Sequence, residues 1–125
     1  MRYTLIHSTF LKEGEQPQEV AFIDLEETGQ STRMDLETIF QLTNNIEGSW
    51  SMGPTLPGGE VNEDYDERII RIVPLKKHKG REYGLRSTSV GDHVRTEDGE
   101  LWICAVFGWE QVQELELNNY RAGRA

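Results

Sequence analysis

Residues 86–109 contain the pattern that most constrains how this chain folds. Within them, Ser87–Asp92 (STSVGD) combines hydroxyl side chains, which can bond to nearby backbone groups, with a glycine that tolerates a positive φ. Such a combination is typical of a tight turn. We therefore predict a turn here, with Gly91 at a positive φ and Val90 packed inward.

Two β-forming segments follow this turn and are separated by a second turn signal. Asp98-Gly99 lies between them, and an Asp-Gly pair in that position is a strong indication of a hairpin. The second segment is almost entirely apolar. We predict antiparallel strands at 92–96 and 101–107, and we expect this hairpin to lie in the centre of a sheet.

Three further segments have the composition of strands. Residues 1–10 and 19–25 are rich in apolar side chains and flank a segment of Gly, Glu, Gln and Pro, which predicts a hairpin. Residues 68–75 carry β-branched side chains and reach Pro74, which we expect to end the strand. A basic turn at 76–81 is expected to follow.

One amphipathic helix is predicted near 32–46. Thr32 and Asp35 resemble a capping box, and the apolar residues after them recur at helical spacing. A helix with one apolar face needs a sheet to cover. We therefore predict one α+β domain over residues 1–125, in which a mostly antiparallel twisted sheet or partial barrel packs against one main amphipathic helix.

The net charge of −9 is unevenly distributed along the chain. Residues 68–95 hold eight basic and two acidic side chains, whereas the segments on either side are acidic. A strongly acidic protein repels nucleic acid at long range and approaches basic surfaces more readily. The total charge therefore favours a basic protein surface as partner over nucleic acid.

Residues 51–66 are expected to form a mobile acidic loop. The segment contains Gly-Pro and Pro-Gly-Gly turns and several carboxylates, with no basic residue among them. Long loops often bind partners, although a merely solvated insertion is the alternative here, and the spacing of a calcium loop is absent. The residues predicted to bind a protein partner are Trp50, Glu60, Glu63, Asp64, Tyr65 and Asp66.

The basic residues after position 75 suggest a second kind of site. A cluster of cations beside glycine and serine can hold a phosphate or another anion. A solvated lysine-rich turn, and a structural role for the arginine at its end, are the alternatives. The candidate anion-binding residues are Lys76, Lys77, Lys79, Arg81, Arg86, Ser87 and Ser89.

No residue pattern points to catalysis, a metal or a cofactor. Ser87, Ser89, Asp92 and His93 include the residue types of a hydrolase triad, but neighbours on one strand alternate between its faces. The histidines lack the spacing of a metal site. Cys104 is the only cysteine, which indicates a buried, inert thiol. We expect a cytoplasmic, non-enzymatic protein with no cofactor, no metal and no membrane segment.

These motifs also resemble a known family. The arrangement of Leu36–Asn45, the turn Arg86–Asp92 and the pair Gly108-Trp109 is similar to the YodL-like domain, found in small proteins encoded on plasmids, phages and other mobile elements. The resemblance covers residues 34–112, and this chain departs from it in a longer acidic middle. It brings no assigned reaction. It implies an accessory protein of a mobile element that acts by binding host factors.

Two functions are therefore expected. The first is a non-enzymatic accessory protein of a mobile genetic element, which binds a host or defence protein through its acidic surface and inhibits, for example, a nucleic-acid enzyme. The alternative is a small β-rich domain that binds nucleic acid or a nucleotide through the basic segment 76–86. The net charge favours the first.

Overall fold

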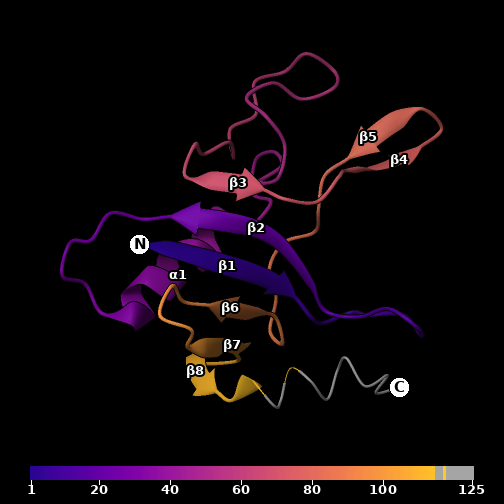
Figure 1. The fold of residues 1–125 in the computed structure, drawn as a ribbon. Coiled ribbons are helices and arrows are strands. Elements are labelled where there is room, and N and C mark those ends of the chain that lie inside the picture. The colour runs from indigo at the N-terminus through magenta and orange to yellow at the C-terminus, as the bar shows by residue number, and fades with distance from the viewer. Residues whose placement is uncertain (115–116, 118–125) are drawn as a thin grey trace.

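Within the part of the chain that the structure describes, the named elements of the main body are six antiparallel strands and the helix α1, and a two-stranded hairpin projects from this body (Figure 1). The structure is a computed structural model, and it describes residues 1–114 and residue 117. The predicted α+β class is confirmed, and the sheet is open rather than closed into a barrel. The elements are β1 (Arg2–His7), β2 (Gln18–Asp24), α1 (Thr32–Leu42), β3 (Ile69–Arg71), β4 (Lys76–His78), β5 (Arg81–Tyr83), β6 (His93–Arg95), β7 (Leu101–Ala105) and β8 (Gly108–Val112).

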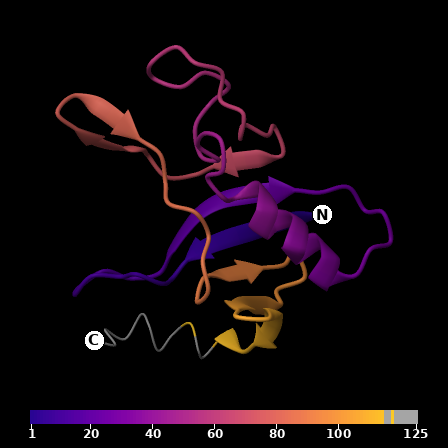
Figure 2. The ribbon, with the colours of Figure 1, turned by 180° about the vertical axis from the view of Figure 1, so that it is seen from behind.

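The strand order is β3-β2-β1-β6-β7-β8, and every neighbouring pair is antiparallel. β1 and β6 form the centre, because the N-terminal strand lies between β2 and β6. The predicted hairpin of β6 and β7 is present, but the expectation that both of its strands are central is wrong for β7. α1 lies across one face of the sheet, as the reverse view shows (Figure 2).

The main core lies between α1 and the sheet face that it covers. Tyr3 and Leu5 of β1 point to this face and are 1% and 0% exposed. Leu36 and Ile39 of α1 are fully buried in the same cluster. The Tyr3 hydroxyl also donates a hydrogen bond to Asp35. The helix is thus joined to the central strand by polar as well as apolar contacts.

The opposite face of the sheet carries both charged and apolar side chains. Ion pairs between side chains lie there, such as Arg95–Glu19 at 2.9 Å. A small apolar cluster of Ile6, Leu101 and Leu117 is buried on the same side. Successive side chains of a strand point to opposite faces of the sheet. Each strand therefore contributes side chains both to the face covered by α1 and to this opposite face.

The ends of α1 differ from the prediction. Its N-cap is Ser31, whose hydroxyl accepts a hydrogen bond from the N–H of Met34 at 3.3 Å, so the capping box predicted at Thr32 is wrong. The helix ends at Leu42 rather than near 46, because Thr43 leaves helical angles and caps it. No helix in the described part of the chain is long and apolar enough to cross a membrane.

The predicted strand at 68–75 is shorter than expected. Only Ile69–Arg71 pair with β2, and the chain leaves the sheet before Pro74, which has no N–H to donate. Residues 76–81, predicted to be a basic turn, instead belong mostly to the strands of a hairpin. The two central residues of its turn, Lys79 and Gly80, have φ of 52° and 78°. Two positive φ angles in succession are typical of the type I′ turn that joins short antiparallel strands.

β8 is absent from the sequence predictions, and β7 is shorter than predicted. Residues 101–107 were expected to form one strand, but Val106 and Phe107 form the turn to β8. Gly108 has φ of 112°, a conformation that residues with side chains rarely adopt, so the chain can reverse there. β8 alternates buried Trp109 with exposed Glu110, which hides its strand character in a search for apolar runs.

Candidate functional site

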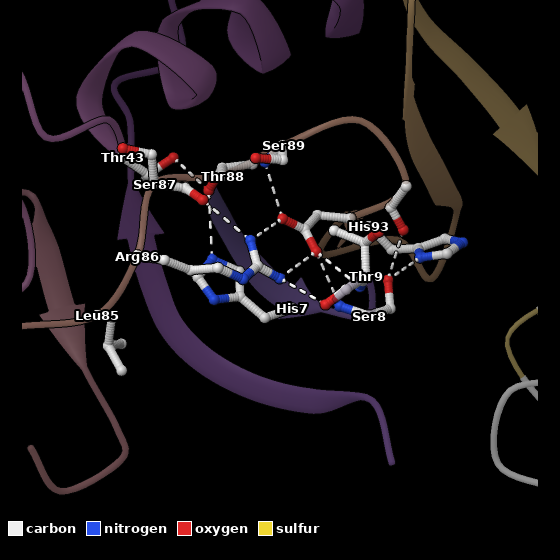
Figure 3. Close-up of polar contacts among 12 residues, drawn as sticks. His7, Ser8, Thr9, Thr43, Leu85, Arg86, Ser87, Thr88, Ser89 and His93 are labelled. Atoms are coloured by element: carbon white, nitrogen blue, oxygen red, sulfur yellow. Dashed lines mark hydrogen bonds and ion pairs between the residues drawn. The ribbon is translucent and has the colours of Figure 1, made fainter. Parts of the chain in front are cut away.

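The turn before β6 is organised around the carboxylate of Asp92, which is fully buried. Figure 3 shows the polar contacts that join Arg86 and Ser89 of this turn to Ser8 and Thr9. The backbone N–H groups of Ser8 and Thr9 donate to Oδ1 at 2.8 and 3.1 Å, and that of Ser89 donates to Oδ2 at 2.8 Å. The guanidinium of Arg86 adds two contacts, Nη1–Oδ2 at 2.7 Å and Nη2–Oδ1 at 2.9 Å. One side chain therefore holds the end of β1 against the turn.

Asp92 and Arg86 form an internal ion pair. Burial alone raises the pKa of Asp92, but the hydrogen bond from Arg86 and the bonds from the backbone outweigh burial and hold that pKa below its ordinary value. The terminal nitrogens of Arg86 also donate to the carbonyls of Ser87 and Thr9, at 2.9 and 3.0 Å. The charge of Arg86 is thus paired within the protein.

Ser87 and Ser89, the other candidate anion ligands of this turn, also take part in internal contacts. Ser87 Oγ accepts a hydrogen bond from the N–H of Asn45 at 2.8 Å, and the N–H of Ser89 is bonded to Asp92. The structure gives Arg86, Ser87 and Ser89 roles in folding the turn. Their predicted role as an open anion site has no support in this geometry.

The glycine of the turn behaves as predicted and the valine does not. Gly91 has φ of 96°, and a Cβ built there lies 3.0 Å from Thr9 Oγ1, so the position excludes a side chain on two grounds. Val90 is 50% exposed, so the prediction that it packs inward is wrong. Thr88 is buried instead, and its hydroxyl oxygen lies 2.8 Å from that of Thr43 in a hydrogen-bond contact.

Ser8 and His93 are in hydrogen-bond contact, with 2.5 Å between Oγ and Nδ1. The single hydroxyl proton of Ser8 is donated to the carbonyl of Gly91 at 2.7 Å, so Nδ1 of His93 is the donor in its contact with Ser8. An activated serine needs the reverse direction, with the imidazole accepting its proton. Ser8 is also only 1% exposed. The geometry therefore fits a structural contact and not a nucleophile.

Cys104 is buried in the main core. Burial raises the pKa of its thiol to about 11, so the thiol stays protonated at neutral pH. Among residues 1–114 and 117, no group of three or more His, Cys, Asp or Glu side chains is placed to hold a metal ion. What the described residues do present is a set of exposed charged and apolar surfaces.

The loop after α1 is built on residues that were predicted to bind a partner. Trp50 is 1% exposed, its ring contacts His7 edge-on at 5.9 Å, and its indole N–H donates to the carbonyl of Arg86 at 2.8 Å. Asp64 accepts hydrogen bonds from three consecutive backbone N–H groups, at 46, 47 and 48. Asp66 pairs with Arg68 at 2.8 Å. These three predicted binding residues are therefore occupied within the protein, and Trp50 is not available at the surface.

The remaining side chains of this loop do face solvent. Glu60 and Glu63 are exposed, as is Tyr65 at 45%. Val61, which the sequence analysis did not single out, is 70% exposed between them. The loop thus presents a small acidic and apolar surface, which we define as Glu60, Val61, Glu63 and Tyr65.

The hairpin of β4 and β5 presents a different chemistry. Its register pairs Lys76 with Tyr83 and His78 with Arg81, so these four side chains share one face. The rings of His78 and Tyr83 lie 6.4 Å apart, and the guanidinium carbon of Arg81 lies 5.8 Å from the centre of the Tyr83 ring. We call this group the basic-aromatic face. Lys77 and its partner residue Glu82 lie on the other face.

All six strand residues of the hairpin are exposed, and the hairpin projects from the sheet (Figures 1 and 2). Within the portion of the chain that the structure describes, no ion pair involves its four cationic side chains, Lys76, Lys77, Lys79 and Arg81. These four cations are among the candidate anion-binding residues predicted from the sequence, whereas His78 and Tyr83 are not. Lys76 and His78 before the turn at Lys79-Gly80, and Arg81 and Tyr83 after it, are each two residues apart. This two-residue spacing is the sequence signal that places the four side chains on one face of a hairpin.

Hollows lie on both sides of this hairpin. One, of about 860 Å³, lies between the hairpin and the loop and includes Arg81 and Glu60 in its lining. The other, of about 320 Å³, lies between the base of the hairpin and the segment after β1. Lys76 and Tyr83 of the basic-aromatic face line this second hollow, together with the buried His7.

His7 is 8% exposed, and its Nε2 lies 3.4 Å from the hydroxyl of Thr88. Burial lowers the pKa of His7 to about 4, so its ring is uncharged at neutral pH. The cations that line the hollow beside it are therefore Lys12, Lys76 and Arg86, of which Arg86 is paired with Asp92.

Comparison with protein-family models, with curated proteins and with solved structures finds no match for this chain. The resemblance to the YodL-like domain therefore stays a prediction from the motifs. Any function must be argued from the exposed surfaces just described.

Proposed function

We propose that the protein binds nucleic acid through the basic-aromatic face of the β4–β5 hairpin. The observation that carries this proposal is the placement of Lys76, His78, Arg81 and Tyr83 on one exposed face. Cations that hold phosphates, combined with aromatic rings on which bases stack, are the usual chemistry of single-strand binding. A projecting two-stranded ribbon also has the shape of elements that enter a nucleic-acid groove.

The net charge of −9 lowers the affinity for nucleic acid, but most of the acidic side chains lie outside the hairpin. At physiological ionic strength, charges farther apart than the Debye length of about 8 Å are largely screened. A phosphate at the end of a projecting hairpin therefore interacts mainly with the hairpin's own unpaired cations. We expect weak binding that depends strongly on salt.

Titration of a labelled single-stranded oligonucleotide, followed by fluorescence anisotropy, tests the proposal. With about three phosphate contacts, the logarithm of the association constant should fall with the logarithm of salt concentration with a slope of about −2. Joint replacement of Lys76, Lys79 and Arg81 by Gln should abolish most of this binding. Joint replacement of Glu60 and Glu63 by Gln should preserve it. Binding that is unchanged by the hairpin substitutions rejects the proposal.

A second candidate function is binding of a protein with a basic surface. The observation that favours it is the exposed loop surface of Glu60, Val61, Glu63 and Tyr65, where acidic and apolar side chains alternate. Exposed apolar side chains rimmed by charge often mark protein interfaces. In the setting that the YodL-like resemblance implies, the partner is a cytoplasmic host or defence protein, and the basic groove of a nucleic-acid enzyme fits this surface.

Partner capture distinguishes the two candidates. Replacing Val61 and Tyr65 by Ser, and Glu60 and Glu63 by Gln, should leave the melting temperature unchanged and remove a partner that binds the loop. The hairpin variant should keep that partner. A protein partner that is lost only in the hairpin variant contradicts the second candidate.

A further inference from the structure

The hollow of about 320 Å³ beside the hairpin is lined by aromatic, cationic, apolar and polar side chains, and the one carboxylate among them, Glu15, accepts a hydrogen bond from the N–H of Lys12 at 2.6 Å. His7 lines it as a buried residue, and Phe10 and Tyr83 supply exposed aromatic rings. Lys12 and Lys76, which belong to segments far apart in sequence, supply positive charge. Its size lies at the lower end of the range of about 300–1,000 Å³ that is usual for small-ligand sites. It therefore fits one small ligand and not a long segment of polymer.

Phe10 has an unusual backbone conformation and an unusually exposed side chain for an aromatic residue. Its φ is 55°, in the left-handed region that bulky side chains rarely adopt, and its side chain is 73% exposed. The guanidinium carbon of Arg86 lies 5.3 Å from the centre of its ring. Arg86 is itself fixed by its hydrogen bonds to the buried Asp92. Its contact with Phe10 therefore holds the ring of Phe10 beside the hollow. A strained and exposed aromatic side chain suggests selection for binding and not for packing.

We propose that this hollow binds one unpaired nucleotide, with the base against the rings of Phe10 and Tyr83 and the phosphate at Lys12 and Lys76. The inference rests on the proposed function and names the ligand of the same surface. A flat ring that carries an anionic group satisfies both kinds of lining side chain, whereas inorganic phosphate leaves the aromatic rings unused. The ligand is a nucleoside phosphate, either free or as one residue of a single strand.

The hollow requires a base that is not stacked within a duplex. Bases in a duplex are paired and stacked, and extruding one costs free energy. The proposal therefore predicts preference for a single strand over a duplex of the same length. Hairpin cations alone would favour the duplex or show no preference, because the duplex has the higher charge density.

The test uses the full chain with three probes: an oligothymidylate, a DNA duplex of the same length, and thymidine 5′-monophosphate. The variants are Phe10→Gly, Lys12→Gln, the hairpin variant in which Lys76, Lys79 and Arg81 are replaced by Gln, and, as a control on the opposite hairpin face, Lys77→Gln. Phe10→Gly removes the ring at a position where glycine tolerates the backbone angle, so the melting temperature should hold or rise. A loss of binding in this variant is then due to the missing aromatic ring and not to unfolding of the protein.

The expected result is at least fivefold tighter binding of oligothymidylate than of duplex, with a loss of that preference in both Phe10→Gly and Lys12→Gln. If free thymidine 5′-monophosphate displaces the oligothymidylate, a free nucleotide is sufficient as the ligand of the hollow. If it does not, the ligand is one nucleotide of a single strand. If Phe10→Gly and Lys12→Gln bind the oligomer as the parent does while the hairpin variant does not, the hollow is rejected and the proposed function survives. If the monophosphate binds but neither oligomer does, the proposed function fails and the hollow remains. Absence of binding to all three probes rejects both.

Discussion

The backbone N–H of Ser8 donates to the buried carboxylate of Asp92 at 2.8 Å, across 84 positions of the sequence. This contact fixes the end of β1 beside the turn from which β6 starts. Arg86 completes the arrangement from the chain that returns from the projecting hairpin. The same carboxylate therefore holds Thr9 and Arg86, which both line the 320 Å³ hollow.

Asp92→Asn should destabilise the protein by about 3 kcal/mol, because it leaves the Arg86 guanidinium partly buried without its counter-charge. Urea unfolding measures the change. Arg68→Gln, which breaks a more exposed pair with Asp66, serves as control and should cost less than about 1 kcal/mol. Equal effects of the two substitutions would show that Asp92 is not the organising group of the turn.

Gly91→Ala should cost about 1–3 kcal/mol, since it adds a Cβ that crowds Thr9 to the strain of a positive φ. Gly99→Ala is the matched control. Gly99 has φ of 91° but no atom within 4 Å of a Cβ built there, so that substitution reports backbone strain alone. Thermal melting should place Gly91→Ala below Gly99→Ala, and a reversed order contradicts the contact with Thr9.

Stability should fall as the pH is lowered from about 6.5 to about 4. The pKa of His7 is lowered from 6.5 to about 4 in the folded protein, so in this window the unfolded chain binds a proton that the folded chain refuses. At 1.36 kcal/mol per pKa unit, His7 accounts for a loss of about 3 kcal/mol. Burial also lowers the pKa of His93, which adds a loss of the same sign.

His7→Gln isolates the part of this fall that belongs to His7. Its free energy of unfolding, measured by urea titration at several pH values, should vary less between pH 6.5 and 4 than that of the parent. Below that window, both proteins should lose the stability due to Asp92, whose pKa is lowered and whose charge is lost in acid. An identical fall in the two proteins above pH 4 contradicts the assignment to His7.

Asp64→Ala should lower stability by about 1–2 kcal/mol, because it leaves the N–H groups of residues 46, 47 and 48 without their acceptor. Its neighbour Glu63 is exposed, so Glu63→Ala should lie within about 0.5 kcal/mol of the parent. Chemical denaturation of the two variants compares them directly. A stable Asp64→Ala would return this residue to the set available for binding a partner.

Local turn chemistry explains which parts of the fold could be predicted from the sequence. Gly91 and Asp98-Gly99 mark their turns by residue type, and the strands beside them lie where expected. The type I′ turn at Lys79-Gly80 lacks the Asn or Asp that usually marks it, so the local sequence predicts one basic turn and not two strands. β8 was missed because an edge strand with polar residues has no continuous apolar run.

The roles of the site residues depended on long-range contacts that composition does not reveal. Trp50 and Asp64 lie in a segment with every local feature of a loop, yet one fills the core and the other accepts backbone hydrogen bonds. Tyr83 and Phe10 become candidate site residues only through the fold, which places them beside Lys76 and Lys12 in the lining of one hollow. The net charge predicts the acidic loop as the binding surface, whereas our proposal rests on the hairpin cations, which form no ion pair with any described residue.

Lys76 and Lys77 provide the most direct test of nucleic-acid binding by the basic-aromatic face. They are adjacent lysines on opposite faces of one hairpin, so Lys76→Gln and Lys77→Gln remove the same charge from almost the same place. Anisotropy titration of an oligothymidylate at fixed salt should show a several-fold loss of affinity for Lys76→Gln and a clearly smaller loss for Lys77→Gln. Equal losses, or a larger loss for Lys77→Gln, would contradict recognition by this face.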